Sequence, residues 1–204
     1  MKVKICGITN LEDALMCENY GAHALGFVFY SKSKRFIEQE QAKIIINKLS
    51  PFTIKVGVFV NESIEVINYI AHKIKLNVVQ LHGEESKETI NSVLFPSIKG
   101  FRINKDFDFS ILSEYKNCHY LLDSHSEKDY GGSGQKFDWN LIPKEIKNRI
   151  ILSGGISSNN LEQIKEEVNP LAIDISSSLE ITPGKKSEYK VKEFFSIYNH
   201  LRKN

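Results

Sequence analysis

Reactive side chains stand at the ends of apolar, strand-like runs in this sequence. Cys6 ends the run Val3-Lys4-Ile5-Cys6, where apolar and charged residues alternate as they do in a half-buried strand. Asp123 ends a second run at 119–123, and His82 directly follows a third at 77–81. Taken singly, Cys6 also fits a small buried hydrophobe, and Asp123 a helix cap or turn former. Their shared position at strand ends is what marks them as candidates for chemistry.

Two further strand ends carry small residues suited to binding an anion. Gly154 and Gly155 stand between an apolar run and a helix start, where the missing Cβ atoms let an anion approach backbone N–H groups. After the last run, Ser176 and Ser177 fit a short extra helix whose N-terminus adds N–H donors. A tight turn and a helix cap explain each piece alone. The two together, in this order, predict a phosphate site.

The elements that position these residues alternate regularly along the chain. Eight apolar runs are typical of strands, and most of the gaps between them have amphipathic, helix-like patterns, the weakest at 103–117. The runs span residues 2–6, 24–29, 54–60, 77–81, 97–102, 119–123, 149–153 and 171–175. Eight such units predict a single-domain (β/α)₈ TIM barrel over residues 1–204, whose site lies at the carboxyl ends of the strands. An open doubly wound sheet is the alternative, without the GxGxxG turn of its dinucleotide-binding form.

Composition excludes several classes of partner and site. The 204 residues include 27 basic and 25 acidic ones, and the basic residues are scattered, so nothing favours nucleic acid or membrane as a partner. The sequence has neither a signal-peptide pattern nor a membrane-length apolar run, which predicts a cytoplasmic protein. Three cysteines without CxxC spacing and six scattered histidines predict neither disulfides nor a metal site.

Several longer motifs extend this pattern over the whole chain. They are KICGIT at 4–9, GFVFYSKSKRF at 26–36, VGVFVN at 56–61, VQLHG at 79–83, LLDS at 121–124, GGSGQKFDW at 131–139, LSGGI at 152–156, DISSSLE at 174–180 and PGKK at 183–186. With these motifs the sequence closely resembles the phosphoribosylanthranilate isomerase family of tryptophan biosynthesis. The resemblance implies a cofactor-free Amadori rearrangement of a small phosphosugar, N-(5-phosphoribosyl)anthranilate, to an aminodeoxyribulose phosphate.

The resemblance also implies roles for single residues. Asp123 matches the family's general acid and Cys6 its general base, which removes a proton from C2 of the sugar. The acid must then be protonated and the thiol ionised near neutral pH, the reverse of their reference pKa values of about 3.9 and 8.5. Raising an aspartate pKa by about three units corresponds to roughly 4 kcal/mol, which burial can supply, whereas nearby N–H dipoles or cations can lower the pKa of a thiol.

Substrate binding is assigned in the same way. Arg35 matches the family's anchor for the anthranilate carboxylate, although a solvated arginine in a lysine-rich loop is the simpler alternative. Gln80 and His82 are expected at the substrate, with a packed strand-end histidine as the alternative for His82. The sequence departs from the family pattern at Lys34, Ser178 and Ser187, where proline, glycine and aspartate are expected. The glycine-rich stretch 131–134 fits a mobile cover over the site.

Two other functions remain open. A related synthase such as indole-glycerol-phosphate synthase needs a catalytic lysine at a strand end, for which Lys4 is the one loose candidate. A phosphosugar-binding sensor would keep the phosphate loops and need neither Cys6 nor Asp123. The oligomeric state, monomer or homodimer, is left open as well.

Overall fold

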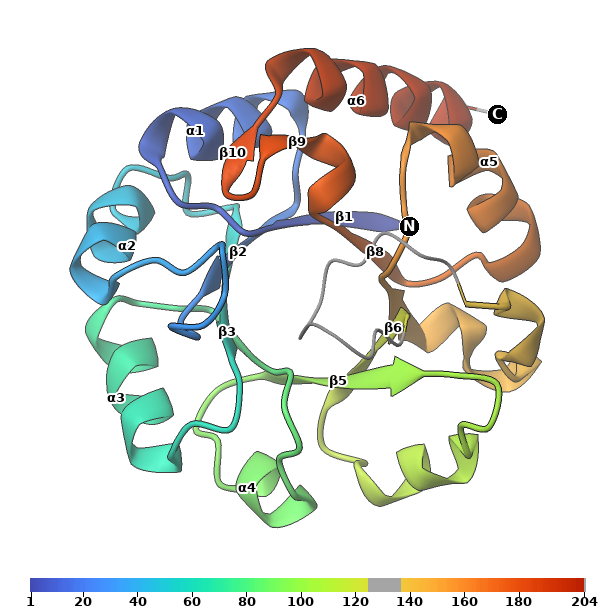
Figure 1. Ribbon diagram of the computed structural model, residues 1–204, viewed down its shortest axis with the longest axis horizontal. Helices are drawn as coiled ribbons and strands as arrows, with labels where there is room; N and C mark the ends of the chain where they lie inside the picture. The colour runs from blue at the N-terminus through green and yellow to red at the C-terminus, as the bar shows by residue number, and fades with distance from the viewer. Residues whose placement is uncertain (125–136, 204) are drawn as a thin grey trace.

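Eight parallel strands close into a barrel in the computed structural model, which describes residues 1–124 and 137–203 (Figure 1). The strands are β1 (Lys2–Cys6), β2 (Ala24–Val28), β3 (Ile54–Phe59), β4 (Val78–Leu81), β5 (Ser97–Ile103), β6 (His119–Ser124), β7 (Ile150–Leu152) and β8 (Ala172–Ile175). Each pairs with the next along the chain, and β8 pairs with β1. The predicted (β/α)₈ barrel is confirmed, and the open sheet is excluded because its two edges are hydrogen-bonded to each other.

Helices surround the barrel in a ring (Figure 1). The α-helices are α1 (Leu11–Tyr20), α2 (Gln39–Ile46), α3 (Ile64–Lys73), α4 (Lys87–Asn91), α5 (Leu161–Gln163) and α6 (Glu188–Lys203). Shorter 3₁₀ segments are η1 (Phe109–Glu114), η2 (Trp139–Leu141), η3 (Lys144–Arg149), η4 (Ser158–Asn160) and η6 (Ser177–Leu179), and η5 (Ile164–Val168) is a π-helix. A small hairpin of β9 (Glu180–Thr182) and β10 (Lys185–Lys186) follows η6.

Helices α1 and α3 begin at side-chain caps. Asn10 accepts a hydrogen bond from the Asp13 amide at 2.9 Å, and Ser63 accepts one from the Val66 amide at 3.4 Å. Each cap satisfies an N–H group that has no partner within its helix. The weakly patterned segment 103–117 forms only the 3₁₀ turn η1, which buries Leu112 alone. One buried side chain does not provide the apolar stripe that holds a longer helix against a barrel.

Two apolar clusters fill the molecule. The larger lies between the strands and the helices, and the smaller consists of Ala24, Val56, Ile98, Leu121 and Ile151. The smaller cluster takes one residue from each of five strands, which fits a layer across the barrel interior below the carboxyl ends. The prediction of a half-buried first strand is wrong, because Lys4 is buried as well as Val3 and Ile5. A closed barrel buries both faces of a strand, so the charged side chain points into the interior instead of into water.

Helix α6 packs beside α1 and completes the ring (Figure 1). Its Tyr198 ring stacks on Phe194, with centroids 6.4 Å apart, and the Tyr198 hydroxyl donates to the Met1 carbonyl at 2.7 Å. Tyr198 is 2% exposed, whereas Tyr189 of the same helix is 73% exposed. One tyrosine therefore ties the last helix to the first residue of the barrel, and the other faces solvent.

These two tyrosines give a matched test of that packing. Tyr198→Ala should lower the free energy of unfolding by about 3–5 kcal/mol, because it leaves a cavity and an unpaired carbonyl. Tyr189→Ala should change it by no more than about 0.5 kcal/mol. Urea denaturation followed by circular dichroism measures both. Equal losses from the two variants would contradict the role given to Tyr198.

Candidate active site

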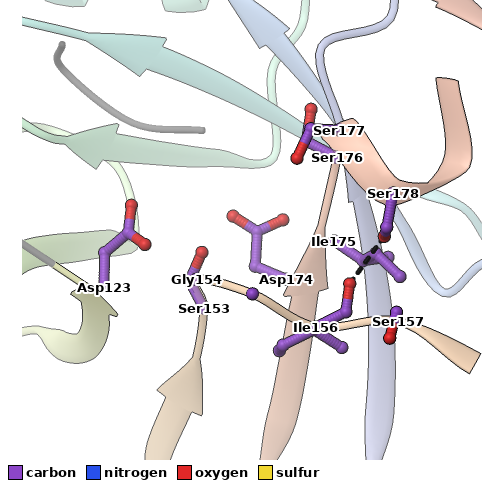
Figure 2. A pocket seen from close by; sticks show the side chains of 11 residues that line it. Asp123, Ser153, Gly154, Ile156, Ser157, Asp174, Ile175, Ser176, Ser177 and Ser178 are labelled. Carbon is purple, nitrogen blue, oxygen red and sulfur yellow. Dashed lines mark hydrogen bonds between the residues drawn. The ribbon is translucent and has the colours of Figure 1, made fainter. Parts of the chain in front are cut away.

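A cavity of about 290 Å³ opens at the carboxyl ends of β6, β7 and β8 (Figure 2). Its lining is formed by Asp123, Ser153, Gly154, Gly155, Ile156, Ser157, Asp174, Ile175, Ser176, Ser177 and Ser178. Figure 2 shows the side chains of Asp123, Ser153 and Asp174 standing in a row at the strand ends. All four residues predicted to bind phosphate thus lie in one cavity with the predicted acid.

A second cavity of about 80 Å³ adjoins the first. The two share Asp123, Ser153, Asp174 and Ser176 as lining residues. The second adds the other residues predicted from the sequence, namely Cys6, Arg35, Gln80 and His82. The structure therefore brings every candidate residue to the same end of the barrel, from strands as far apart around the ring as β1 and β6.

The loop after β7 depends on its two glycines. Gly154 and Gly155 have φ angles of 81° and 65°, a conformation that residues with a Cβ adopt only with strain. A Cβ on Gly154 would lie 2.6 Å from the Ser124 amide nitrogen and 2.8 Å from Asp123 Oδ1. The glycine keeps the loop against β6, with its backbone on the cavity wall.

A serine joins this loop to the one after β8. The Ser178 hydroxyl donates to the Ile156 carbonyl at 2.6 Å (Figure 2). Ser178 stands where the family resemblance predicts glycine, and its side chain is used to link the two loops. Ser187, at the position expected for aspartate, precedes α6 and accepts a hydrogen bond from the Lys190 amide at 3.4 Å, as a capping aspartate would. Nothing in the structure explains Lys34.

The predicted acid has an imidazole beside it. His82 Nε2 lies 3.4 Å from Asp123 Oδ2, and His82 Nδ1 lies 3.2 Å from the amide nitrogen of Gln80. Gly100 on the neighbouring strand leaves the space that the imidazole occupies, since a Cβ there would overlap it. Gln80 therefore orients His82, and His82 faces Asp123 across the mouth of the barrel.

Arg35 is held by a partner that the sequence did not reveal. Its Nε and Nη2 atoms donate to the two carboxylate oxygens of Glu180, the shortest contact being 2.7 Å. Lys186 Nζ lies 2.8 Å from the same carboxylate and donates to the Cys6 carbonyl at 2.7 Å. Burial alone would raise the pKa of Glu180, but the hydrogen bonds and charges of Arg35 and Lys186 outweigh it and hold the pKa below its usual value. The guanidinium is thus fixed in one plane at the edge of the smaller cavity.

The surroundings of Cys6 have opposing effects on the pKa of its thiol. Burial raises the pKa of the thiol, and the nearby Lys4 and Lys186 ammonium groups act in the other direction without cancelling it. This direction is opposite to the one that a thiolate base needs. The physical reason is that protein atoms around the sulfur replace the water that would solvate a thiolate.

Asp174 and Glu180 are site residues that sequence reasoning missed, and Lys4 was considered only as the lysine of a synthase. Lys4 Nζ donates to Asp174 Oδ2 at 2.7 Å inside the barrel. The signal available for both was charge within an otherwise apolar run. For Glu180 the sequence held no local signal, because its partner Arg35 lies 145 positions away. The glycine-rich stretch 131–134 lies outside the described residues.

The described part of the chain has the features of neither a metal site nor a membrane span. No group of three histidine, cysteine, aspartate or glutamate side chains there is placed to hold a metal ion. None of the helices described is long and apolar enough to cross a membrane.

Comparison with known proteins shows that the chain is similar to members of one enzyme family. Residues 3–197 match the family model described as N-(5'-phosphoribosyl)anthranilate isomerase. The N-(5'-phosphoribosyl)anthranilate isomerase of Pelobacter propionicus is 42% identical over 203 residues, which cover 99% of this chain and 97% of the relative.

Solved structures show the same similarity. Phosphoribosyl anthranilate isomerase from Thermotoga maritima superposes with a TM-score of 0.90 at 41% identity, over 98% of this chain and 99% of that one. A second such isomerase structure, in complex with reduced 1-(o-carboxyphenylamino)-1-deoxyribulose 5-phosphate, has a TM-score of 0.87 at 40% identity, over 98% of this chain and 99% of that one.

The contact between Glu180 and its two cations makes stability depend on pH. Because the pKa of Glu180 is lowered in the folded state, its contribution is present above the ordinary value of 4.5 and is lost as the pH falls through the folded pKa. Glu180→Gln should cost about 3 kcal/mol at neutral pH, since it leaves Arg35 and Lys186 without a carboxylate. The cost should shrink in acid. Urea denaturation at neutral and acidic pH measures the difference.

Glu84 provides the control for this prediction. It pairs with Arg102 at 3.3 Å, but its side chain is 74% exposed. Glu84→Gln should change the free energy of unfolding by less than about 1 kcal/mol at either pH. A cost for Glu180→Gln that stays constant between the two pH values would show that the buried charge is not its source.

Proposed function

The chain belongs to the N-(5'-phosphoribosyl)anthranilate isomerase family, and from this premise we propose how its own residues carry out the family reaction. The protein converts N-(5-phosphoribosyl)anthranilate to 1-(2-carboxyphenylamino)-1-deoxyribulose 5-phosphate in tryptophan biosynthesis. The observation that carries the proposal is that a thiol on β1 and a carboxyl on β6, Cys6 and Asp123, border the same cavity. An acid and a base on opposite sides of one sugar are what an aldose–ketose rearrangement needs.

The reaction then follows in three proton movements. Asp123 donates its proton to the ring oxygen as the bond from C1 to that oxygen breaks, and the nitrogen lone pair forms the C1–N double bond. Cys6, as thiolate, takes the proton from C2, and the electrons of that bond give the enolamine. The enol proton is lost as C1 gains one, which leaves the ketone. Atoms and electrons balance within the substrate, so no cofactor is required.

Phosphate binding is assigned to the larger cavity. Gly154 and Gly155 present backbone without side chains there, and Ser176 and Ser177 line the facing wall. Phosphate bound by the loops after strands seven and eight is a recurrent feature of such barrels. With the phosphate in this cavity, the sugar extends toward the smaller one, between Cys6 and the pair of Asp123 and His82.

The anthranilate carboxylate is assigned to Arg35 at the rim of the smaller cavity. A planar guanidinium suits a carboxylate, and Glu180 fixes its plane before the substrate arrives. Gln80 and His82 are proposed to contact the sugar. The synthase alternative loses support because its candidate Lys4 is held by Asp174 and is 4% exposed.

Removing the base or the acid tests the assignment directly. Cys6→Ala and Asp123→Asn should each lower kcat about 100- to 10,000-fold, with folding intact by circular dichroism. The assay follows the loss of phosphoribosylanthranilate fluorescence. Cys118→Ala, at the opposite end of the barrel beside His119, is the matched control and should leave kcat unchanged. Activity of Cys6→Ala within about tenfold of wild type would remove the base assignment.

Two glycines with positive φ angles test the phosphate site. Gly21→Ala should destabilise the fold by about 1–2 kcal/mol because of its left-handed backbone, and Gly154→Ala should cost more, because its Cβ would also press on Ser124 and Asp123. Only Gly154 lines the cavity. Inorganic phosphate should inhibit the wild type competitively, and its inhibition constant should rise about tenfold in Gly154→Ala but not in Gly21→Ala. Noncompetitive inhibition by phosphate would count against this site.

A further inference from the structure

Lys4 and Cys6 lie on one face of β1, because they are two residues apart in a strand. In the pairing of β1 with β8, Lys4 lies opposite Asp174. In the pairing of β1 with β2, Cys6 lies opposite Gly26. Register alone therefore places an ammonium, a carboxylate and a thiol side by side inside the barrel, next to a position without a side chain.

Gly26 provides the space in which the thiol and the lysine come together. A Cβ built on Gly26 would lie 2.8 Å from Cys6 Sγ and 3.2 Å from Lys4 Cε. Both side chains therefore occupy the space beside Gly26, where β2 has no side chain. Lys4 Nζ donates to Asp174 Oδ2 at 2.7 Å, and its positive charge acts to lower the pKa of the Cys6 thiol. The ammonium is thus bonded to the carboxylate and lies near the sulfur.

Stability does not account for this arrangement. The side chains of Lys4 and Asp174 are 4% and 6% exposed, so both charges have been taken out of water. The attraction within a buried pair only offsets the cost of that desolvation, and apolar residues of similar size often serve a fold as well. The Asp174 Oδ1 atom also has no hydrogen-bond partner among the described residues. A costly, incompletely satisfied pair beside a reactive thiol points to a role in the chemistry.

We propose that Lys4 is a positioning residue for the reaction: its ammonium, held in place by Asp174, stabilises the thiolate of Cys6 that accepts the C2 proton. The inference rests on the proposed role of Cys6 as the base. It gives that role the cation it requires, since the surrounding protein atoms raise the pKa of the thiol. Lys4 acts on the reaction through the thiol.

Other charges face Cys6 from the surrounding elements. Lys186 of β10 donates to the Cys6 carbonyl, but its charge is balanced by Glu180. Asp174 of β8 is an anion and opposes ionisation of the thiol, and burial raises its own pKa. Arg35, Asp123 and His82 border the cavity from other elements. Among all of these, Lys4 opposes the effect of burial on the Cys6 pKa most strongly.

The test measures ionisation of Cys6 apart from catalysis. Iodoacetamide alkylation, followed by peptide mass spectrometry across a pH series, gives the midpoint for Cys6 alone. Lys4→Met keeps the length of the side chain and removes its charge, so the midpoint should rise by about one pH unit or more. Asp174→Asn removes the opposing anion and leaves Lys4, so the midpoint should fall. Cys118 in the same samples is the internal control and should not move.

Steady-state kinetics supply the second measurement. Lys4→Met should lower kcat about tenfold or more at neutral pH with KM changed less than about threefold, and activity should recover as pH rises toward the new midpoint. Lys4→Arg, which keeps the charge, should restore part of kcat if the longer side chain is accommodated. A loss caused only by altered packing would not shift the pH profile.

The outcomes separate this inference from the function it rests on. The inference about Lys4 is overturned if the Cys6 midpoint is unchanged in Lys4→Met, or if it shifts in the same direction in Lys4→Met and Asp174→Asn. A low activity of Cys6→Ala would still support Cys6 as the base in that case. Shifted midpoints without any change in kcat would instead contradict Cys6 as the base. If Lys4→Met does not fold because it leaves Asp174 unpaired, the double variant Lys4→Met/Asp174→Asn replaces it. The alkylation midpoint of Cys6 in the double variant must lie above the midpoint in Asp174→Asn.

Discussion

The pairing of β8 with β1 closes the barrel, and the arrangement of polar residues at the carboxyl ends of these strands depends on it. Lys4 meets Asp174 across this seam, and the Ser176 hydroxyl donates to the Cys6 carbonyl across it at 3.0 Å. Lys186 spans the same seam from above, reaching the carbonyls of Cys6 and Ser176 at 2.7 and 3.4 Å. The thiol, the buried carboxylate and the loop after β8 are therefore aligned by one set of contacts. A shift of one residue in register would turn Lys4 and Cys6 toward the helices and separate all three.

Burying charged side chains in a barrel is unfavourable, because the charges lose their contact with water. Among the described residues, three buried ammonium groups are paired with carboxylates, in the pairs Lys4–Asp174, Lys99–Glu85 and Lys186–Glu180, whereas the buried Lys55 donates to the Ser50 carbonyl. Each pair joins residues from different elements or from the two ends of a loop, so it also fixes geometry. Inside the barrel, a layer of apolar side chains lies below the polar groups that line the cavity at the carboxyl ends of the strands.

The sequence predicted the strands well because an apolar run between turn signals is a local property. All eight strands lie within two residues of the expected bounds at each end. The helix predicted weakly at 103–117 is reduced to a 3₁₀ turn, since only Leu112 is buried there. Partnerships between distant residues were beyond such reasoning. Nothing near Arg35 in the chain indicates Glu180, whose approach depends on closure of the whole ring.

The burial of Lys4 shows a different limit of sequence reasoning. Alternation of apolar and charged residues describes a strand with one wet face, but in a closed barrel the second face looks inward. The same pattern is therefore compatible with a solvated lysine and with a buried one. The residue opposite Lys4 in β8 decides between a buried and a solvated lysine, because an inward-pointing lysine needs an anion beside it. The strand register places Asp174 at that position.

The chemistry of the two candidate groups explains why a cation belongs on one side of the cavity. Exclusion of water favours the protonated form of any acid, whether thiol or carboxyl. That effect helps a group that must donate a proton and hinders one that must accept it. In the reaction proposed for this site, the thiol is therefore the group that needs a neighbouring cation. Lys4 stands on the strand of Cys6 and not on that of Asp123, which places the positive charge where the asymmetry of the reaction requires it.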